Sequence, residues 1–198
     1  MCTDRKLHYI GTDPNPDNIG RYERVGNFYN THCNQDNPFF GDGSSNTFEI
    51  YQLGSEVIGD DENFLKYFGK LDFVFTSPPY FNREQYSQDE NQSFKKFSAY
   101  EDWRDNFLKP TLDTAFSFLK NDRYLCWNIA DIKVGSDKFI PLEQDSIDVV
   151  ESLGGEYKGI YKMLMTRMVG INASNVKNSV ELDGKYYKFE PILVFYKP

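Results

Sequence analysis

The segment with the clearest chemical potential is Ser77-Pro78-Pro79-Tyr80, which follows an apolar run with strand character over residues 71–75. Proline has no amide hydrogen to donate to a strand ladder, so the strand must end here. Two successive prolines also stiffen the turn and fix the direction of the neighbouring carbonyl groups. A rigid strand end that carries a hydroxyl, oriented carbonyls and a flat ring can hold a planar group that bears an amine.

An amine on an aromatic base or an amide is a poor nucleophile, because its lone pair is delocalised. Acceptors placed on its two hydrogens favour the pyramidal form, in which the lone pair is available. The Ser77 hydroxyl and the Pro78 carbonyl are suitable acceptors, and Tyr80 would stack on the planar group. No strong base is needed if the electrophile is a sulfonium methyl. The structural alternative is an ordinary strand-ending turn with Tyr80 packed in the core, but the whole pattern favours a functional role.

Size and composition indicate one soluble domain. The chain has 198 residues, of which 39% are hydrophobic and 26% charged, which suits a single core. No apolar run approaches the ~20 residues that a membrane span needs, and no signal peptide is recognisable. Three cysteines at wide spacing give neither a disulfide framework nor a zinc pattern, so we expect no metal and a reducing, cytoplasmic setting.

The formal net charge of −8 argues against a protein that coats nucleic acid indiscriminately, because phosphate binding relies on clustered Lys and Arg. A small basic patch on an otherwise acidic surface remains compatible with this net charge. Arg83, Lys95 and Lys96 lie just after the proline turn. Each of them could equally belong to an ordinary solvated surface.

Strand and helix patterns alternate along the chain. We expect one domain over residues 1–198, with strands near residues 8–11, 47–51, 71–75, 123–129, 157–168 and 188–197. The clearest helices are predicted over residues 100–119, with a kink or break at Pro110, and 142–153; shorter helical segments are expected over 21–29 and 62–68. Residues 170–185 read as a loop, and polar residues 82–99 as a mobile active-site loop.

This order predicts an α/β fold with a mostly parallel sheet and an antiparallel hairpin at its C-terminal edge. Ligands of such sheets bind beyond the carboxyl ends of the strands. Asp13, Ser55, Ser77 and Asn128 all lie at the carboxyl ends of predicted strands. One rim of the sheet could therefore carry all of these polar residues.

The sequence from Thr76 to Tyr80 resembles the fourth motif of the amino-methyltransferases that use S-adenosylmethionine. In that family the motif binds the exocyclic amine of adenine or cytosine, with the base flipped out of double-stranded DNA. The resemblance implies S-adenosylmethionine as cofactor, DNA as partner, DNA methylation of the restriction–modification kind, and Ser77, Pro78, Pro79 and Tyr80 as catalytic residues. The resemblance extends over residues 8–198. Residues 190–197 look like the last core strand of the family's Rossmann-like sheet.

Further roles carry over from the resemblance. Asp13 matches the acid that binds the ribose hydroxyls of the cofactor, although a turn Asp before Pro14 explains it nearly as well. The segment Gly54-Ser55-Glu56 matches the third motif, in which a polar residue contacts the adenine ring of the cofactor, and Ser55 stands where an acid is usual. Asn128 and Asp131 match a later strand end, where helix capping explains them equally. Arg83, Phe94, Lys95 and Lys96 are placed where they could bind the nucleic acid near the flipped base.

The family's first motif, a strand and a glycine-rich turn, should precede Tyr9 by about one βα unit. Only eight residues stand before Tyr9, and Gly41-Asp42-Gly43 lacks the flanking elements to replace that motif. We therefore expect an N-terminally truncated domain without the first strand and helix, with weakened cofactor affinity. An exposed strand edge there would allow self-association into a homo-oligomer.

Two other functions stay open at this point. One is a methyltransferase that acts on an RNA base or a protein glutamine amide; its relatives usually carry Asn where this chain has Ser77. The other is an inactive fragment that folds or self-associates without binding the cofactor. The sequence alone does not separate adenine from cytosine as the target.

Overall fold

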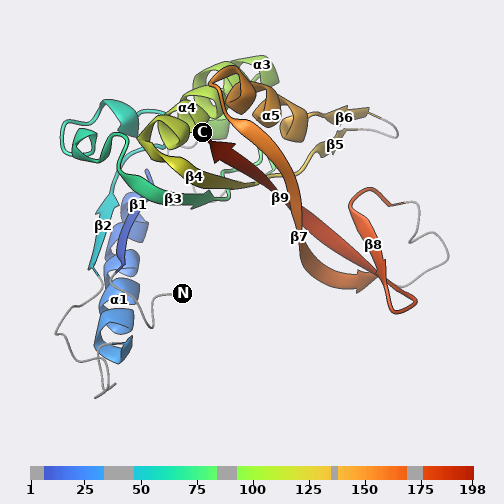
Figure 1. Ribbon diagram of the computed structural model, residues 1–198, viewed down its shortest axis with the longest axis horizontal. Helices are drawn as coiled ribbons and strands as arrows, with labels where there is room; N and C mark the ends of the chain where they lie inside the picture. Colours follow the sequence, from blue (N-terminus) through green and yellow to red (C-terminus); the bar gives the residue numbers. More distant parts are fainter. Residues whose placement is uncertain (1–6, 34–46, 84–92, 135–137, 169–175) are drawn as a thin grey trace.

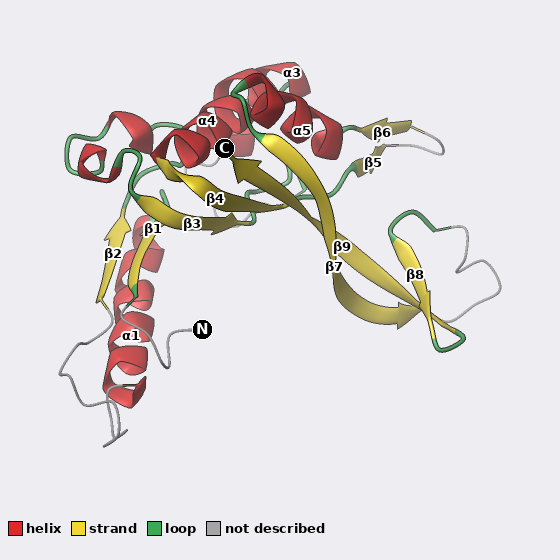
Figure 2. Cartoon of the chain, in the orientation of Figure 1, coloured by secondary structure: helices red, strands yellow, loops and turns green. Residues whose placement is uncertain are grey.

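The computed structural model describes residues 7–33, 47–83, 93–134, 138–168 and 176–198. Figure 1 shows three groups of elements: an N-terminal unit at one end, a main sheet with its helices above it, and a long ribbon that extends away at the other end. Figure 2 shows that the helices over the main sheet gather on one side of it. Within the described residues, no helix is long and apolar enough to span a membrane.

The N-terminal unit consists of strand β1 (His8–Thr12), helix α1 (Pro16–Cys33) and strand β2 (Thr47–Tyr51), with the two strands paired in parallel. Both strands were predicted at these positions. Helix α1 is much longer than the helical turns expected over 21–29. Its Asn and Gly content hides the helical period, but the ring of Phe48 on β2 packs against Gly26, where a Cβ atom would come within 2.4 Å of the ring.

Between β2 and the main sheet, the chain forms two 3₁₀ turns, η1 (Ile58–Asp60) and η2 (Leu65–Tyr67), in place of the short helix expected over 62–68. A small apolar cluster made by Ile58, Phe64 and Phe118 lies under this segment, and Ile10 of β1 packs against it. The rings of Phe64 and Phe118 stack at 4.5 Å. This cluster attaches the N-terminal unit to the main sheet.

The main sheet has the strand order β3-β4-β9-β7. Strand β3 (Leu71–Thr76) runs parallel to β4 (Leu119–Asn128), and β9 (Lys185–Lys197) runs antiparallel to β4 and to β7 (Glu156–Met168). The predicted α/β fold with an antiparallel C-terminal hairpin is confirmed. Strand β4 begins four residues before the predicted start at Arg123.

Two short antiparallel pairings lie in segments that we did not predict as strands. Strand β8 (Ser179–Leu182) pairs with β9 through a tight turn at Asp183 and Gly184, whose φ angles are +50° and +68°. Positive φ at both central residues is typical of a type I′ hairpin turn, for which Asp-Gly is a preferred sequence. Strands β5 (Ile132–Val134) and β6 (Lys138–Ile140) form the second pair.

One face of the main sheet carries the helices. The predicted helix over 100–119 is divided into α3 (Tyr100–Trp103), a π-helical turn η3 (Arg104–Leu108) and α4 (Lys109–Phe118). Pro110 lies in the first turn of α4, where its missing N–H costs least, and the wide π turn directly precedes it. Helix α2 (Ser93–Lys96) and helix α5 (Leu142–Ser152) complete the layer, and α5 ends close to its predicted end.

The main core fills the space between these helices and the sheet. Its fully buried members come from α3, η3, α4, α5 and the central strands and include Leu108, Leu112, Leu125, Trp127 and Phe195. Lys197 at the end of β9 donates to the carbonyls of Phe116 (2.8 Å) and Leu119 (2.8 Å), so the last strand closes the C-terminal end of α4.

Replacing Leu112 by Ala should lower the free energy of unfolding by ~2–5 kcal/mol, because Leu112 is fully buried and its neighbours cannot fill the space. Urea unfolding followed by circular dichroism measures the loss. The control Leu65→Ala, at a side chain that is 46% exposed, should cost less than about 1 kcal/mol. Equal losses in both variants would contradict this position of the core.

Glu49 holds β2 to η2, because its carboxylate accepts hydrogen bonds from Lys66 (2.9 Å), Tyr67 (2.7 Å) and Tyr51 (2.8 Å). The bonds from Lys66 and Tyr67 lower the pKa of Glu49 from 4.5 to about 2. The resulting stability is fully present above pH 4.5 and is lost as the pH falls towards 2. Glu49→Gln should therefore make urea stability less dependent on pH in this window, whereas Glu151→Gln on the exposed face of α5 should leave the dependence unchanged.

Candidate active site

The proline segment forms a rigid turn at the end of β3. Ser77 is exposed, Pro78 is buried, and Phe81 has a left-handed backbone with φ of +47°. The amide of Phe81 donates to the Pro79 carbonyl at 3.0 Å, and among the described residues no group donates to the Pro78 carbonyl. The Phe81 ring is 5% exposed and packs edge-on against Tyr100 and Trp103. Burial of this ring holds the turn in a backbone conformation that a bulky residue rarely adopts.

Tyr80 is fixed by a buried side chain from the neighbouring strand. Its hydroxyl donates to Oδ1 of Asn128 at 2.7 Å. Asn128 is 2% exposed and ends β4, and its Nδ2 lies 4.0 Å from the sulfur of Met163 on β7. The structure thus brings Asn128 to the proline segment, as expected for two polar residues at adjacent strand ends.

Asp13 follows β1 and makes three local contacts. Its carboxylate accepts from the amide of Asn15 (2.8 Å), the side-chain amide of Asn18 (3.0 Å) and the hydroxyl of Tyr22 (2.6 Å). The bond to Asp13 raises the pKa of Tyr22 to about 12. These contacts match the turn interpretation of Asp13, and one lone-pair site, on Oδ1, is left for a further donor.

Gly54, Ser55 and Glu56 form a compact turn after β2. A Cβ atom on Gly54 would lie 2.3 Å from Oε2 of Glu56, so glycine is needed for Glu56 to fold back. The side chain of Glu56 is only 5% exposed and pairs with Lys96 at 3.0 Å. Ser55 Oγ lies 3.1 Å from Thr111 Oγ1 on α4.

The sequence analysis included Glu56 in the third-motif match but gave its side chain no role of its own. The motif comparison placed the polar contact at Ser55, but the buried acid stands one position later. Its adjacency to Gly54-Ser55 was the available signal. The Lys96 partner comes from α2, beyond the proline segment, so this ion pair joins the two strand-end regions of the site.

The basic candidates have partners of their own. Arg83 donates to the Lys133 carbonyl at 2.7 Å, and Lys96 is held by Glu56. Lys95 is half-buried on α2, and the side chain of Phe94 lies outside the described part of the chain. Residues 84–92 of the predicted active-site loop also lie outside it.

Asp131 has a structural position near the start of α5. Its carboxylate accepts from the amide of Glu143 (2.8 Å), and its own amide donates to Glu143 Oε1 (3.1 Å). Lys177 pairs with the same carboxylate. This reciprocal pair fits the capping interpretation. Across the described ranges, no cluster of three or more His, Cys, Asp or Glu residues is placed to hold a metal.

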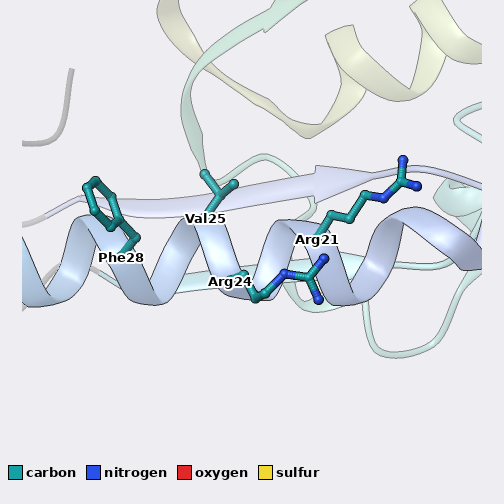
Figure 3. Close-up of a pocket in the computed structure, with 4 residues that line it drawn as sticks. All are labelled: Arg21, Arg24, Val25 and Phe28. Carbon is teal, nitrogen blue, oxygen red and sulfur yellow. The ribbon is translucent and has the colours of Figure 1, made fainter.

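The site residues fall into two linked groups. Ser77 to Tyr80 and Asn128 form the first, and the ends of β1 and β2 with Asp13, Gly54 and Ser55 form the second. The Asp13 amide donates to Tyr51 of β2 at 3.1 Å, which holds the second group together. A shallow hollow lined by Arg21, Arg24, Val25 and Phe28 lies along α1, and Figure 3 shows these four side chains on successive turns of that helix.

Comparison with solved structures finds three proteins that resemble part or most of this chain. A protein from Thermus thermophilus, provisionally assigned as a DNA modification methylase and complexed with S-adenosyl-L-methionine, is 18% identical with a TM-score of 0.45, covering 74% of this chain and 54% of that one. Precorrin-6y C5,15-methyltransferase from Geobacter metallireducens GS-15 is 10% identical with a TM-score of 0.46, covering 98% and 80%. An S-adenosylmethionine-dependent methyltransferase from Methanosarcina mazei is 12% identical with a TM-score of 0.46, covering 97% and 82%.

This chain spans about half the length of the Thermus protein. No curated protein matches the sequence. The family of N6 and N4 methyltransferases described as DNA methylase matches residues 71–198, from the first residue of β3 through the proline segment and the C-terminal hairpin. The match covers well over half of the sequence, which confirms the resemblance inferred from the Ser-Pro-Pro-Tyr segment: the chain belongs to the DNA methylase family.

Proposed function

We propose that this chain transfers a methyl group from S-adenosylmethionine to the exocyclic amine of cytosine or adenine in DNA. The observation that carries the proposal is the rigid turn from Ser77 to Tyr80, with the Tyr80 hydroxyl bonded to the buried Asn128. Membership in the DNA methylase family supports the same reaction.

The turn supplies the two acceptors that an amine needs. The exposed Ser77 hydroxyl and the Pro78 carbonyl, which no described group engages, accept the two amine hydrogens, and their positions are fixed before the substrate arrives. Tyr80 stacks on the base. Pro79, which stands between Pro78 and Tyr80, fixes the position of the Tyr80 ring relative to the Pro78 carbonyl. Asn128 acts as a positioning residue, since it fixes the phenol end of Tyr80 and so limits rotation of the ring.

Asp13, Gly54 and Ser55 would hold the cofactor. A carboxylate oxygen accepts from a ribose hydroxyl, and Oδ1 of Asp13 retains one lone-pair site beyond its local contacts. The Glu56 carboxylate fills the space beside Gly54 and is paired with Lys96, which would fix the turn that presents Ser55 to the cofactor. When bound, S-adenosylmethionine supplies an electrophilic methyl group that needs no strong base at the amine.

The DNA would lie along the exposed side of the turn, with the target base flipped out of the duplex. Arg83 and Lys95 flank that turn, and Phe94 and Lys96 share helix α2 with Lys95. Lys96 would contribute by holding α2 against Glu56. The arrangement supports contact with the strand that carries the target and does not distinguish cytosine from adenine.

Parallel transfer assays test the proposal. Tritiated S-adenosylmethionine is offered with duplex DNA, RNA or protein, and label is expected in DNA, in cytosine or adenine after hydrolysis. Label in RNA or in a glutamine amide would favour the other amine substrates. Calorimetry with S-adenosylmethionine should show stoichiometric binding; absence of binding would favour a fragment that folds without the cofactor.

Tyr80→Ala should reduce methyl transfer by about 10- to 100-fold, because stacking on a base is worth ~1–3 kcal/mol. S-adenosylmethionine binding should be unchanged, because Tyr80 belongs to the amine side of the site. The matched control is Tyr161→Ala, at an exposed tyrosine of β7, two strands away from β4. Unchanged transfer by the Tyr80 variant would contradict the assignment.

The hydrogen bond between Tyr80 and Asn128 should appear as a coupling energy of about 1 kcal/mol. A cycle of Tyr80→Phe, Asn128→Leu and the double variant measures it in urea unfolding. The double variant should be less destabilised than the sum of the single ones, because Asn128→Leu alone leaves a hydroxyl without its acceptor. Strict additivity would show that the bond does not form in solution.

A further inference from the structure

The C-terminal ribbon of this acidic protein is basic. Residues 157–198 carry seven of the 22 Lys and Arg residues but three of the 30 Asp and Glu residues. Their formal net charge is therefore +4, whereas residues 1–156 carry −12. A marked difference in charge between two parts of one chain is typical of a protein that binds a polyanion. The described strands of this segment are β7, β8 and β9, and Figure 1 shows them extending away from the main sheet.

The strand register places three cations on one face of the ribbon. Residues directly opposite each other in antiparallel strands share a face, and successive residues of a strand alternate between faces. Positions 185, 187, 189 and 191 of β9 therefore lie on the same face. This face carries Lys185 itself, Arg167 opposite position 187 and Lys162 opposite position 191. The Lys162 ammonium lies 5.0 Å from the centre of the Phe189 ring, as expected for neighbours on this basic face.

The carboxylates of the ribbon lie elsewhere. Glu190 is opposite Met163 and Glu181 is opposite Tyr186, so both acids belong to the other face. A hydrogen bond with Glu181 raises the pKa of Tyr186, which agrees with this register. Asp183 lies in the hairpin turn. The three cations of the basic face are exposed, and among the described residues no carboxylate forms an ion pair with any of them.

The ribbon starts beside the candidate site. Met163, the neighbour of Lys162 on β7, lies 4.0 Å from Asn128, which holds Tyr80. Between positions 191 and 185 of β9 the ribbon extends by about 20 Å, at ~3.3 Å per residue. This length corresponds to about six base pairs of duplex DNA, at ~3.4 Å per pair. The basic face is therefore long enough to follow several phosphates away from the target base.

We propose that Lys162, Arg167 and Lys185 bind the phosphate backbone of duplex DNA beside the target base. This inference rests on the proposed function for the identity of its partner. The three cations can neutralise phosphates without first leaving a carboxylate, whereas Lys96 is held by Glu56. Contacts to phosphate fix the position of a protein on the duplex and do not read its sequence. The ribbon would thus hold the duplex while the turn from Ser77 to Tyr80 acts on the base.

An acidic protein segment or an anionic membrane could also be attracted to the basic face. Neither partner explains why the ribbon starts at the site of a DNA methylase. The charge of −12 on residues 1–156 also opposes the approach of the rest of the chain to an anionic membrane. Duplex DNA is the partner that fits both the charge and the position of the ribbon.

The salt dependence of DNA binding tests the proposal. Fluorescence anisotropy with a labelled duplex of about 20 base pairs measures the affinity of the full chain between about 50 and 200 mM salt, without S-adenosylmethionine. Lys162→Gln/Arg167→Gln/Lys185→Gln should weaken binding by about 10- to 100-fold at the low-salt end. The slope of log K against log salt should fall in magnitude by about 2 to 3, because each phosphate contact contributes about 0.9. Arg167→Gln alone should lower it by about 1, and Lys162→Arg/Arg167→Lys/Lys185→Arg should retain it.

The matched control is Arg24→Gln/Lys70→Gln/Lys109→Gln, which removes the same charge at exposed positions outside the ribbon and should keep the slope. An unchanged slope in the ribbon variant, or an equal loss in the control, would overturn the proposal. Loss of binding to polyglutamate or to phosphatidylserine vesicles in place of DNA would also overturn it and assign the face to that partner. Because the readout is binding without a methyl donor, salt-dependent DNA binding by the ribbon would stand even if the methyl-transfer assay failed, and the reverse also holds.

Discussion

The end of β3 is the constraint on which the rest of the site depends. Pro78 and Pro79 end the strand, and the buried ring of Phe81 holds the following turn in a left-handed backbone. Because β3 is parallel to β4, the turn reaches the position at which Asn128 ends the neighbouring strand. The hydrogen bond from Tyr80 to Asn128 then ties the aromatic ring to the sheet. The proline segment, which is a local sequence feature, thus depends on one contact with a distant residue, Asn128, to fix the orientation of the Tyr80 ring.

The parts of the fold that follow from local sequence were the ones that could be predicted. Strand β2 has the predicted bounds, Thr47–Tyr51, because its alternating pattern is bounded by clear turn residues. Helix α1 was underestimated, because its Asn and Gly residues lower helix propensity and its packing partner Phe48 is distant in sequence. The π turn before Pro110 also depends on packing that no local pattern reveals.

The same division applies to the site. Ser77 to Tyr80 could be recognised from residue type and order, since proline chemistry acts locally. The burial of the Glu56 side chain was not predicted, because it depends on Lys96, which comes from a different element. Arg83 and Lys96 were interpreted from placement along the chain, yet both are engaged with protein groups. To contact phosphate, either side chain would have to exchange one partner for another, which lowers the gain from a surface charge pair.

The position of β9 has a consequence for how the protein is made. Strand β9 is the last described element, yet it lies between β4 and β7, and its Lys197 completes the end of α4. The ribosome releases the chain from the N-terminus, so β4 and β7 cannot pair with β9 until the final described residues have emerged. During synthesis the centre of the sheet is therefore absent, and β4 presents an unpaired edge. The sheet is completed only when β9 joins β4 and β7, so this region folds after all three strands have been made.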